Sequence, residues 1–265
     1  MSLHLASIHV YPVKSLGGFA PSAAQLTDRG LQHDRRWMLV DEQGKFLSQR
    51  ELAAMACLHC SPEDEGFLVH DLRNGASLQL PWSIAKGESQ RAQLWSDTLP
   101  MLHGDPAWDA WFSAQLERTV HLVYMPDASK RNTDGRYAKG MTTLSDAFPY
   151  LIISQASLDD LNARLSEPVG MERFRPNFVI ADGVPYQEDG WKNIRIGRFS
   201  FDLVKACARC VIITTDQQRG ERSKEPLSSL AKYRAHGQKV RFGMYAMGSG
   251  TGSLHTGDDV IVISP

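Results

Sequence analysis

Cys210 is the residue whose chemistry follows most directly from its neighbours. It comes directly after Arg209 and before the apolar run at residues 211–213. A neighbouring guanidinium favours the thiolate form of a cysteine, which binds metals and attacks electrophiles. A cysteine beside apolar residues is also commonly a small core residue, so the assignment of Cys210 depends on what else surrounds it.

The four cysteines form two CxxC pairs, Cys57 with Cys60 and Cys207 with Cys210. Two such pairs supply the four thiolates of a structural zinc site, which makes zinc one alternative. The first pair lies where we expect a helix to give way to a strand, and cysteines are common there as core residues, so we rank zinc lower. Cys207 is expected to be a bystander, because residues three apart in an extended strand point to opposite faces.

Basic and polar residues recur at the ends of predicted strands, in segments 14–15, 34–37 and 174–177. Arginine binds phosphate through two parallel hydrogen bonds, while Lys14 and Ser15 add a positive charge and a hydroxyl donor. Together these segments predict a site for an anionic ligand. For each arginine taken alone, a solvated or ion-paired surface position is the alternative.

Seven short segments resemble motifs of the MOSC family, in which a MOSC domain follows an N-terminal β-barrel domain. The resemblance covers nearly the whole chain. The segments are YPVKS at 11–15, DRRW at 34–37, FRPN at 174–177, EDGW at 188–191, RC with TTD within 209–216, KEPL at 224–227 and FG at 242–243.

The resemblance implies a molybdenum cofactor (Mo-molybdopterin), with Cys210 as the metal ligand. Ala208 and Arg209 are implied to contact the cofactor beside that ligand, and Asp146 to line the pocket as a catalytic proton carrier. A soft thiolate suits a metal that already carries sulfur ligands, and cations suit a phosphate. The residues implied to hold the pterin and its phosphate are Lys14, Ser15, Arg35, Arg175 and Asn177.

Within the family, the chain is most similar to the members that reduce N-hydroxylated compounds. That similarity implies reduction of hydroxylaminopurines, amidoximes and hydroxylamines to amines. No further cysteine cluster follows Cys210 to hold an iron–sulfur centre. We therefore expect electrons to come from a separate protein, either ferredoxin-like or a flavin reductase, that docks near the basic mouth of the site.

A different class of function uses the same thiol. In that alternative the chain is a sulfur carrier or a cofactor-handling protein, and Cys210 holds a persulfide that it delivers to another enzyme.

The elements that must position these residues are mostly short strands. Asp105, as the cap, and the proline after it predict a helix to about residue 116. Leucines at helical spacing, with Ser154 available to cap the start, predict another at 154–165. The polar stretch at 127–143 predicts a loop over or beside a site. Strands are expected at 6–13, 36–40, 46–48, 67–69, 77–80, 178–180, 193–196, 199–204, 211–213 and 259–263, and a further helix at 226–234.

This pattern predicts a mainly β fold with some α (α+β), because no repeated strand–helix alternation is present to build a parallel sheet. The sheet-like first third gives way to a helix between residues 95 and 120. We predict a β-barrel N-terminal domain at 1–115 and a β-barrel-like MOSC domain at 116–265.

Composition indicates an ordered globular protein. The 265 residues are 42% hydrophobic and 22% charged, and the formal net charge is −1. That balance lacks the basic excess of a nucleic-acid binder, and no apolar run is long enough for a membrane helix. With no export signal, we expect a cytoplasmic protein with reduced cysteines.

Overall fold

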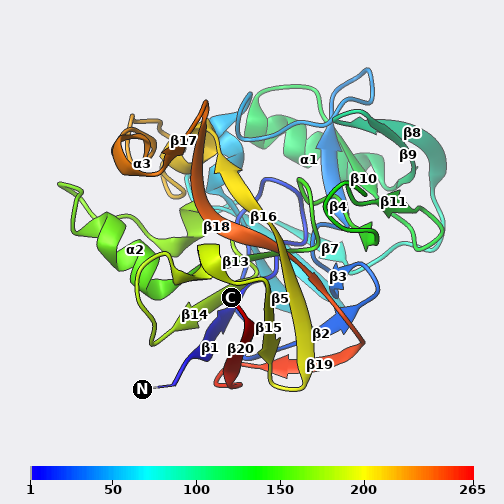
Figure 1. Cartoon of the computed structure of the whole chain (residues 1–265). Helices are drawn as coiled ribbons and strands as arrows, with labels where there is room; N and C mark the ends of the chain where they lie inside the picture. Colours follow the sequence, from blue (N-terminus) through cyan, green and yellow to red (C-terminus); the bar gives the residue numbers. More distant parts are fainter. Residues whose placement is uncertain (1) are drawn as a thin grey trace.

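The first and last strands of the chain belong to the same sheet, an eight-stranded, nearly closed barrel (Figure 1). The computed structural model describes residues 2–265. β13 and β14 run parallel, whereas the other neighbouring strands described here pair antiparallel. The strands, in order across the sheet, are β1 (His4–Ile8), β14 (Phe178–Ala181), β13 (Tyr150–Ser154), β18 (Lys239–Gly248), β16 (Phe199–Arg209), β15 (Asn193–Ile196) and β20 (Val260–Ser264), and β17 (Ala235–His236) pairs with β18.

The barrel closes where β1 meets the start of β20. The Leu5 N–H donates to the Asp258 carbonyl at 2.9 Å. Aromatic rings fill the interior, where the centroids of Tyr150, Phe178 and Phe201 lie 5.2–5.3 Å from one another. Side chains of the first and last strands, Leu5 and Val260 among them, pack into this one hydrophobic core.

Smaller sheets come mostly from the first half of the chain. They show that the strands expected at 36–40, 67–69 and 77–80 are correct. The four-stranded sheet contains β4 (Trp37–Val40), β10 (His121–Tyr124), β9 (Asp97–His103) and β8 (Glu88–Leu94), in that order. The others are β5 (Leu58–Glu63), β6 (Gly66–Asp71) and β7 (Ser77–Pro81); β19 (Gly252–His255), β2 (Ala23–Thr27) and β3 (Gly30–Leu31); and β11 (Arg131–Asn132) with β12 (Met141–Thr142).

The expected helices are present with the expected caps. The Asp105 carboxylate accepts the Ala107 N–H at the start of α1 (Pro106–Leu116), and Ser154 accepts the Ser157 N–H at the start of α2 (Gln155–Asn162). α2 ends three residues earlier than predicted. The remaining helical segments are α3 (Leu227–Tyr233) and four 3₁₀ turns, η1 (Ala53–Cys57), η2 (Met171–Arg173), η3 (Gln187–Gly190) and η4 (Val211–Thr214).

α1 packs on the four-stranded sheet, and α2 and α3 pack on the outer face of the barrel. Alternation along β13 explains the second contact. Ile152 points into the barrel core, whereas Ile153 joins a second cluster that includes Leu161 of α2 and Leu230 of α3. β13 therefore has apolar side chains on both faces.

The strand predicted at 211–213 is wrong, because these residues form η4. The β-branched run suggested a strand. In the structure, Ile213 is buried while Val211 is 38% exposed, and the Ile213 N–H turns back to the Cys210 carbonyl at 3.3 Å. A helical turn lets Ile213 pack into the cluster under α2 and α3 while Val211 stays exposed.

Two other predicted strands are shorter than expected. The strand predicted at 6–13 ends at Ile8, because the chain then leaves the barrel: Val10 bridges to Phe19 and Val13 to Trp37. The strand predicted at 46–48 is reduced to one bridge, between Phe46 and Val40.

The fold is mainly β with three α-helices among residues 2–265, as predicted. No helix in that described range combines the length and apolar character needed to span a membrane. β1 pairs with β14, and β10 pairs with β4 and β9, so strands from the two halves pair with each other. The domain division at residue 115 stays a prediction.

Candidate functional site

All nine site residues predicted from the sequence line one cavity. Its volume is about 90 Å³, which is room for a small group. These residues are Lys14, Ser15, Arg35, Asp146, Arg175, Asn177, Ala208, Arg209 and Cys210.

Strand ends bring these residues together. Lys14 follows the bridge from Val13 to Trp37, and its N–H donates to the Trp37 carbonyl at 2.8 Å. Arg35 lies just before β4, and Arg209 is the last residue of β16. Segments from distant parts of the chain therefore meet beside the barrel, where Leu151 and Cys207 of its outer face also line the cavity.

Three of the site residues hold left-handed backbone conformations. The φ angles are 69° at Ser15, 50° at Arg35 and 55° at Arg175. Such angles cost free energy for residues with side chains, and they concentrate at binding and catalytic sites. The surrounding structure keeps these three residues in fixed positions.

The Tyr11 ring packs against both Arg35 and Arg175. The Arg35 and Arg175 guanidinium carbons lie 4.6 Å and 4.3 Å from the centre of its ring. Burial raises the pKa of Tyr11 to about 12, so its hydroxyl keeps its proton. The aromatic face thus holds two like charges close together by cation–π attraction.

The two arginines differ in how they are paired. Arg35 donates to the Asp34 carboxylate at 2.5 Å and to the Asn177 side-chain oxygen at 3.2 Å. Burial lowers the pKa of Arg35, but Asp34 outweighs burial and the net shift is upward. Burial, and then repulsion from Arg35, lower the pKa of Arg175 to about 10. Arg175 is therefore the less compensated cation.

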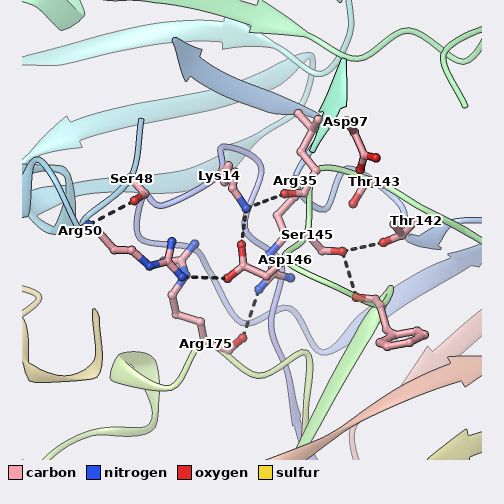
Figure 2. A network of polar contacts seen from close by, with 12 residues as sticks. Lys14, Arg35, Ser48, Arg50, Asp97, Thr142, Thr143, Ser145, Asp146 and Arg175 are labelled. Atoms are coloured by element: carbon pink, nitrogen blue, oxygen red, sulfur yellow. Dashed lines mark hydrogen bonds and ion pairs between the residues drawn. The ribbon is translucent and has the colours of Figure 1, made fainter. Parts of the chain in front are cut away.

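Asp146 lies between two cations, as Figure 2 shows. Its carboxylate accepts from Lys14 Nζ at 2.6 Å and lies 3.7 Å from an Arg50 nitrogen. Burial raises the pKa of Asp146, but Lys14 and then Arg50 outweigh it and hold the pKa far below its usual value. Burial lowers the pKa of Lys14 to about 8, even with Asp146 beside it. At neutral pH both groups are charged.

Three guanidinium groups at the cavity keep a buried nitrogen with no hydrogen-bond partner among residues 2–265. The atoms are Arg50 Nη1, Arg175 Nη2 and Arg209 Nη2. A buried donor on a cation is costly to leave unpaired. Three at one cavity indicate that the site is built to receive an anion.

Arg209 and Cys210 stand at the end of β16, where the strand turns into η4. The Arg209 Nε–H donates to the Phe242 carbonyl at 2.8 Å, and an Nη1–H donates to the Phe174 carbonyl at 2.9 Å. Cys210 is half-buried at the cavity wall. The guanidinium is thus fixed at the cavity that Cys210 also lines.

Cys207 also lines the cavity, so the expectation that it packs away from the pocket is wrong. The strand ends at Arg209, and Cys210 begins η4. The rule that side chains alternate between the two faces of a strand therefore does not apply from Cys207 to Cys210. Burial raises the pKa of the Cys207 thiol, which stays protonated.

The zinc alternative is not supported by the positions of the cysteines. Cys60 belongs to the core of the N-terminal half, and Cys207 to the cluster under α2 and α3. Cys57 donates to the Gln218 carbonyl at 3.3 Å. Within the described residues, no cysteine belongs to a group of three or more side chains close enough to share a metal ion.

A second cavity of about 580 Å³ adjoins the first. The segment predicted as a loop beside a site contributes part of its wall, and Trp95 another part. Its volume suits an organic ligand. The residues that line both cavities are Arg50, Asp146, Phe148, Ala208 and Tyr245.

Sequence reasoning missed several residues of the site. Arg50 stacks on the Trp95 ring at 4.7 Å and closes one side of both cavities. Gln49 donates to the Ser15 carbonyl at 2.8 Å. The sequence signal that could have identified Gln49 and Arg50 is their position as two polar residues directly after the strand predicted at 46–48. Tyr245 lies inside a strand, where no sequence signal distinguished it from core.

A pterin-type molybdenum cofactor fits these groups chemically. Such a cofactor combines a soft metal, an organic ring system and an anionic phosphate, and the cavities offer a thiol, organic-sized space and unpaired guanidinium nitrogens. The cation-rich inner cavity suits the anionic group, and the larger cavity has the room that the inner one lacks.

Comparison with known proteins gives relatives of two kinds. Mitochondrial amidoxime-reducing component 1 of Mus musculus is 31% identical over 98% of this chain and 82% of that protein, and the Homo sapiens protein is 30% identical over the same shares. Molybdenum cofactor sulfurase of Oryza sativa subsp. japonica is 32% identical over 91% of this chain but 32% of that protein. The chain thus spans about a third of the length of that sulfurase.

Family models match both halves of the sequence. The MOSC N-terminal beta barrel domain matches residues 2–119, and the MOSC domain matches residues 139–261. These matches cover most of the chain, and the relatives named above extend over nearly all of it. The chain therefore belongs to the MOSC family.

Proposed function

We propose that the chain is a molybdenum-dependent reductase that converts N-hydroxylated compounds to amines. The observation that carries this proposal is the set of three unpaired guanidinium nitrogens around a cavity that contains the Cys210 thiol. The amidoxime-reducing relatives support it, because the chain matches 82% of their length and so carries counterparts of most of their residues.

In this proposal the side chains divide by chemistry. Cys210 ligates the metal, and Arg175 and Arg209 hold the phosphate with their unpaired nitrogens. Arg35 and Asn177 keep that cation cluster in place, while Ser15 and Ala208 line the cavity wall. When bound, the cofactor would supply two electrons at the N–O bond of the substrate.

The reaction balances as R–NH–OH plus two electrons and two protons giving R–NH₂ and water. The larger cavity, of about 580 Å³, would hold both the organic ring system of the cofactor and the substrate. The low pKa of Asp146 keeps it ionised, so its part in catalysis is to hold Lys14 at 2.6 Å. Lys14, with a pKa of about 8, holds an exchangeable proton near neutral pH.

Electrons come from a separate ferredoxin-like protein or flavin reductase in this proposal. Arg136 and Arg131 at the wall of the larger cavity are paired with Asp134 and Asp97. Lys205 and Lys239 at the same wall make its mouth basic, which favours an acidic partner. The cytoplasmic location also stays a prediction.

The second candidate is a sulfur carrier that holds a persulfide on Cys210. Two observations favour it: the likeness to molybdenum cofactor sulfurases, and a thiol that is half-buried rather than enclosed. Its chemistry needs an exposed sulfur but no organic-sized cavity beside it.

The test is turnover of benzamidoxime with chemically reduced benzyl viologen as the electron source. We expect the wild-type protein, expressed with the cofactor, to form one benzamidine per two electrons, and Cys210→Ala to lose this activity. Cys57→Ala is the matched control, because Cys57 lies outside both cavities. An inactive wild type that releases sulfide from Cys210 on treatment with a thiol would establish the carrier; turnover by Cys210→Ala would overturn the assignment of the ligand.

A further inference from the structure

Two histidines and an aspartate converge in the N-terminal half, away from the cofactor site. His103 is the last residue of β9, Asp109 lies in the first turn of α1, and His121 is the first residue of β10. Neither cavity described above is lined by any of the three. Within residues 2–265 they form the one group of three metal-ligating side chains whose donor atoms all lie within 4.8 Å of one another.

Both imidazoles face the same carboxylate oxygen. The distances to Asp109 Oδ2 are 2.7 Å from His103 Nε2 and 2.7 Å from His121 Nδ1. The two rings are nearly perpendicular, with an interplanar angle of 86°. Each facing ring N–H donates to this carboxylate oxygen, and moving that proton to the other ring nitrogen would leave three lone pairs, from three different elements, around one small volume.

The other oxygen of the Asp109 carboxylate is fixed by a backbone hydrogen bond. Asp109 Oδ1 accepts the Leu122 backbone N–H at 2.8 Å, which leaves Oδ2 for the two histidines. Metal sites in proteins commonly fix a ligand in this way with a second hydrogen bond. β9 and β10 are paired strands, so the sheet fixes the spacing of the two histidines.

The donors are close to the spacing that a metal ion requires. Bonds of about 2.0 Å in a tetrahedral zinc site place neighbouring donors about 3.3 Å apart, so each histidine nitrogen must move outward by roughly 0.6 Å. The His121 side chain is 37% exposed and His103 18%, so His121 can turn without disturbing the core. The exposed side also lets water take a fourth position.

We infer that His103, Asp109 and His121 form a binding site for a divalent transition-metal ion of the zinc type. Two nitrogens and one oxygen suit such an ion, whereas Mg²⁺ and Ca²⁺ prefer oxygen ligands alone. The ion would tie α1 to the sheet that it covers, and the inference does not depend on the molybdenum cofactor.

The experiment is titration of the untagged, full-length protein with ZnSO₄ by calorimetry, alongside thermal unfolding. We expect one saturable equivalent at this site and a rise in melting temperature of about 5 °C or more at zinc near 100 times the Kd. His121→Gln should weaken that equivalent at least tenfold, because loss of a group that only orients a ligand already weakens metal binding by about 10–100-fold. Both proteins have the same cysteines, so zinc binding to a thiol would not produce this difference between them.

His70→Gln is the matched control, since His70 is also partly buried and hydrogen-bonded, to Ser61 at 3.0 Å, but lies on β6. It should bind zinc as the wild type does. His103→Gln provides a second test if His121→Gln folds poorly. Equal zinc affinity in the wild type and both cluster variants, or loss of the same equivalent in His70→Gln, would overturn the inference, as would preference for Mg²⁺.

Discussion

At the scale of residues, the site is a compromise between stability and binding. Arg175 is buried beside another cation, and one of its nitrogens has no partner within the described chain. Such a group destabilises the folded protein unless a ligand pairs with it. Residues kept for binding at a cost in stability are common in functional sites.

This view predicts the effect of Arg175→Met on the cofactor-free protein. The variant should be more stable than the wild type by about 1 kcal/mol or more, because an uncompensated buried charge is replaced by an apolar side chain of similar length. The same variant should bind the cofactor more weakly. Denaturant unfolding of cofactor-free protein measures the first effect, and pterin content measures the second.

Arg118→Met is the control for that comparison. Arg118 is exposed, and its substitution should change the free energy of unfolding by no more than about 0.5 kcal/mol. If Arg175→Met were instead clearly destabilised without cofactor, the contacts of Arg175 with Tyr11 and the Leu16 carbonyl would outweigh its buried charge, contrary to this account.

At the scale of elements, strand ends and close strand crossings position the site. β18 passes next to β13, and Gly243 makes that passage possible: a Cβ there would lie 2.6 Å from an Ile153 side-chain carbon and 2.9 Å from the Ile152 carbonyl oxygen. Its φ is +79°, which also favours glycine. Phe242, whose carbonyl holds Arg209, is the residue just before it.

We therefore predict that Gly243→Ala destabilises the protein by about 2–4 kcal/mol, since it combines left-handed strain with overpacking against backbone. Gly75→Ala separates the two causes. Gly75 has φ +75° but open space around it, so its variant should lose only about 1 kcal/mol. Urea unfolding measures the free energy of unfolding of both variants. Equal decreases in the two would show that crowding against β13 is unimportant.

The sequence predicted elements well where the signal was local. The caps at Asp105 and Ser154 gave the starts of α1 and α2, because a cap acts on the next few residues. The strand prediction at 211–213 was wrong because the backbone conformation of these residues depends on packing against a cluster that is distant in the sequence. Arg50 was missed for a similar reason: its role comes from Trp95 and Asp146, far away in the sequence.

At the scale of the whole molecule, the site lies between the two halves of the chain. Lys14 and Arg35 come from the first 115 residues, whereas Arg175 and Cys210 come from the rest. Neither predicted domain holds a complete site. Local patterns identified the basic segments, but only the resemblance to a family implied that they gather around Cys210, because residue spacing alone says nothing about contacts across more than a hundred residues.

The central claim is that this shared cavity binds a molybdenum–pterin cofactor through Cys210. The most direct measurement is the molybdenum and pterin content of freshly purified protein, by elemental mass spectrometry and fluorescence of the oxidised pterin. Wild type, Cys210→Ala and Cys57→Ala are compared after expression in a host that makes the cofactor. We predict molybdenum and pterin in the wild type and Cys57→Ala, and loss of molybdenum in Cys210→Ala. Molybdenum retained in full by Cys210→Ala, or a wild type that carries neither molybdenum nor pterin, would contradict it.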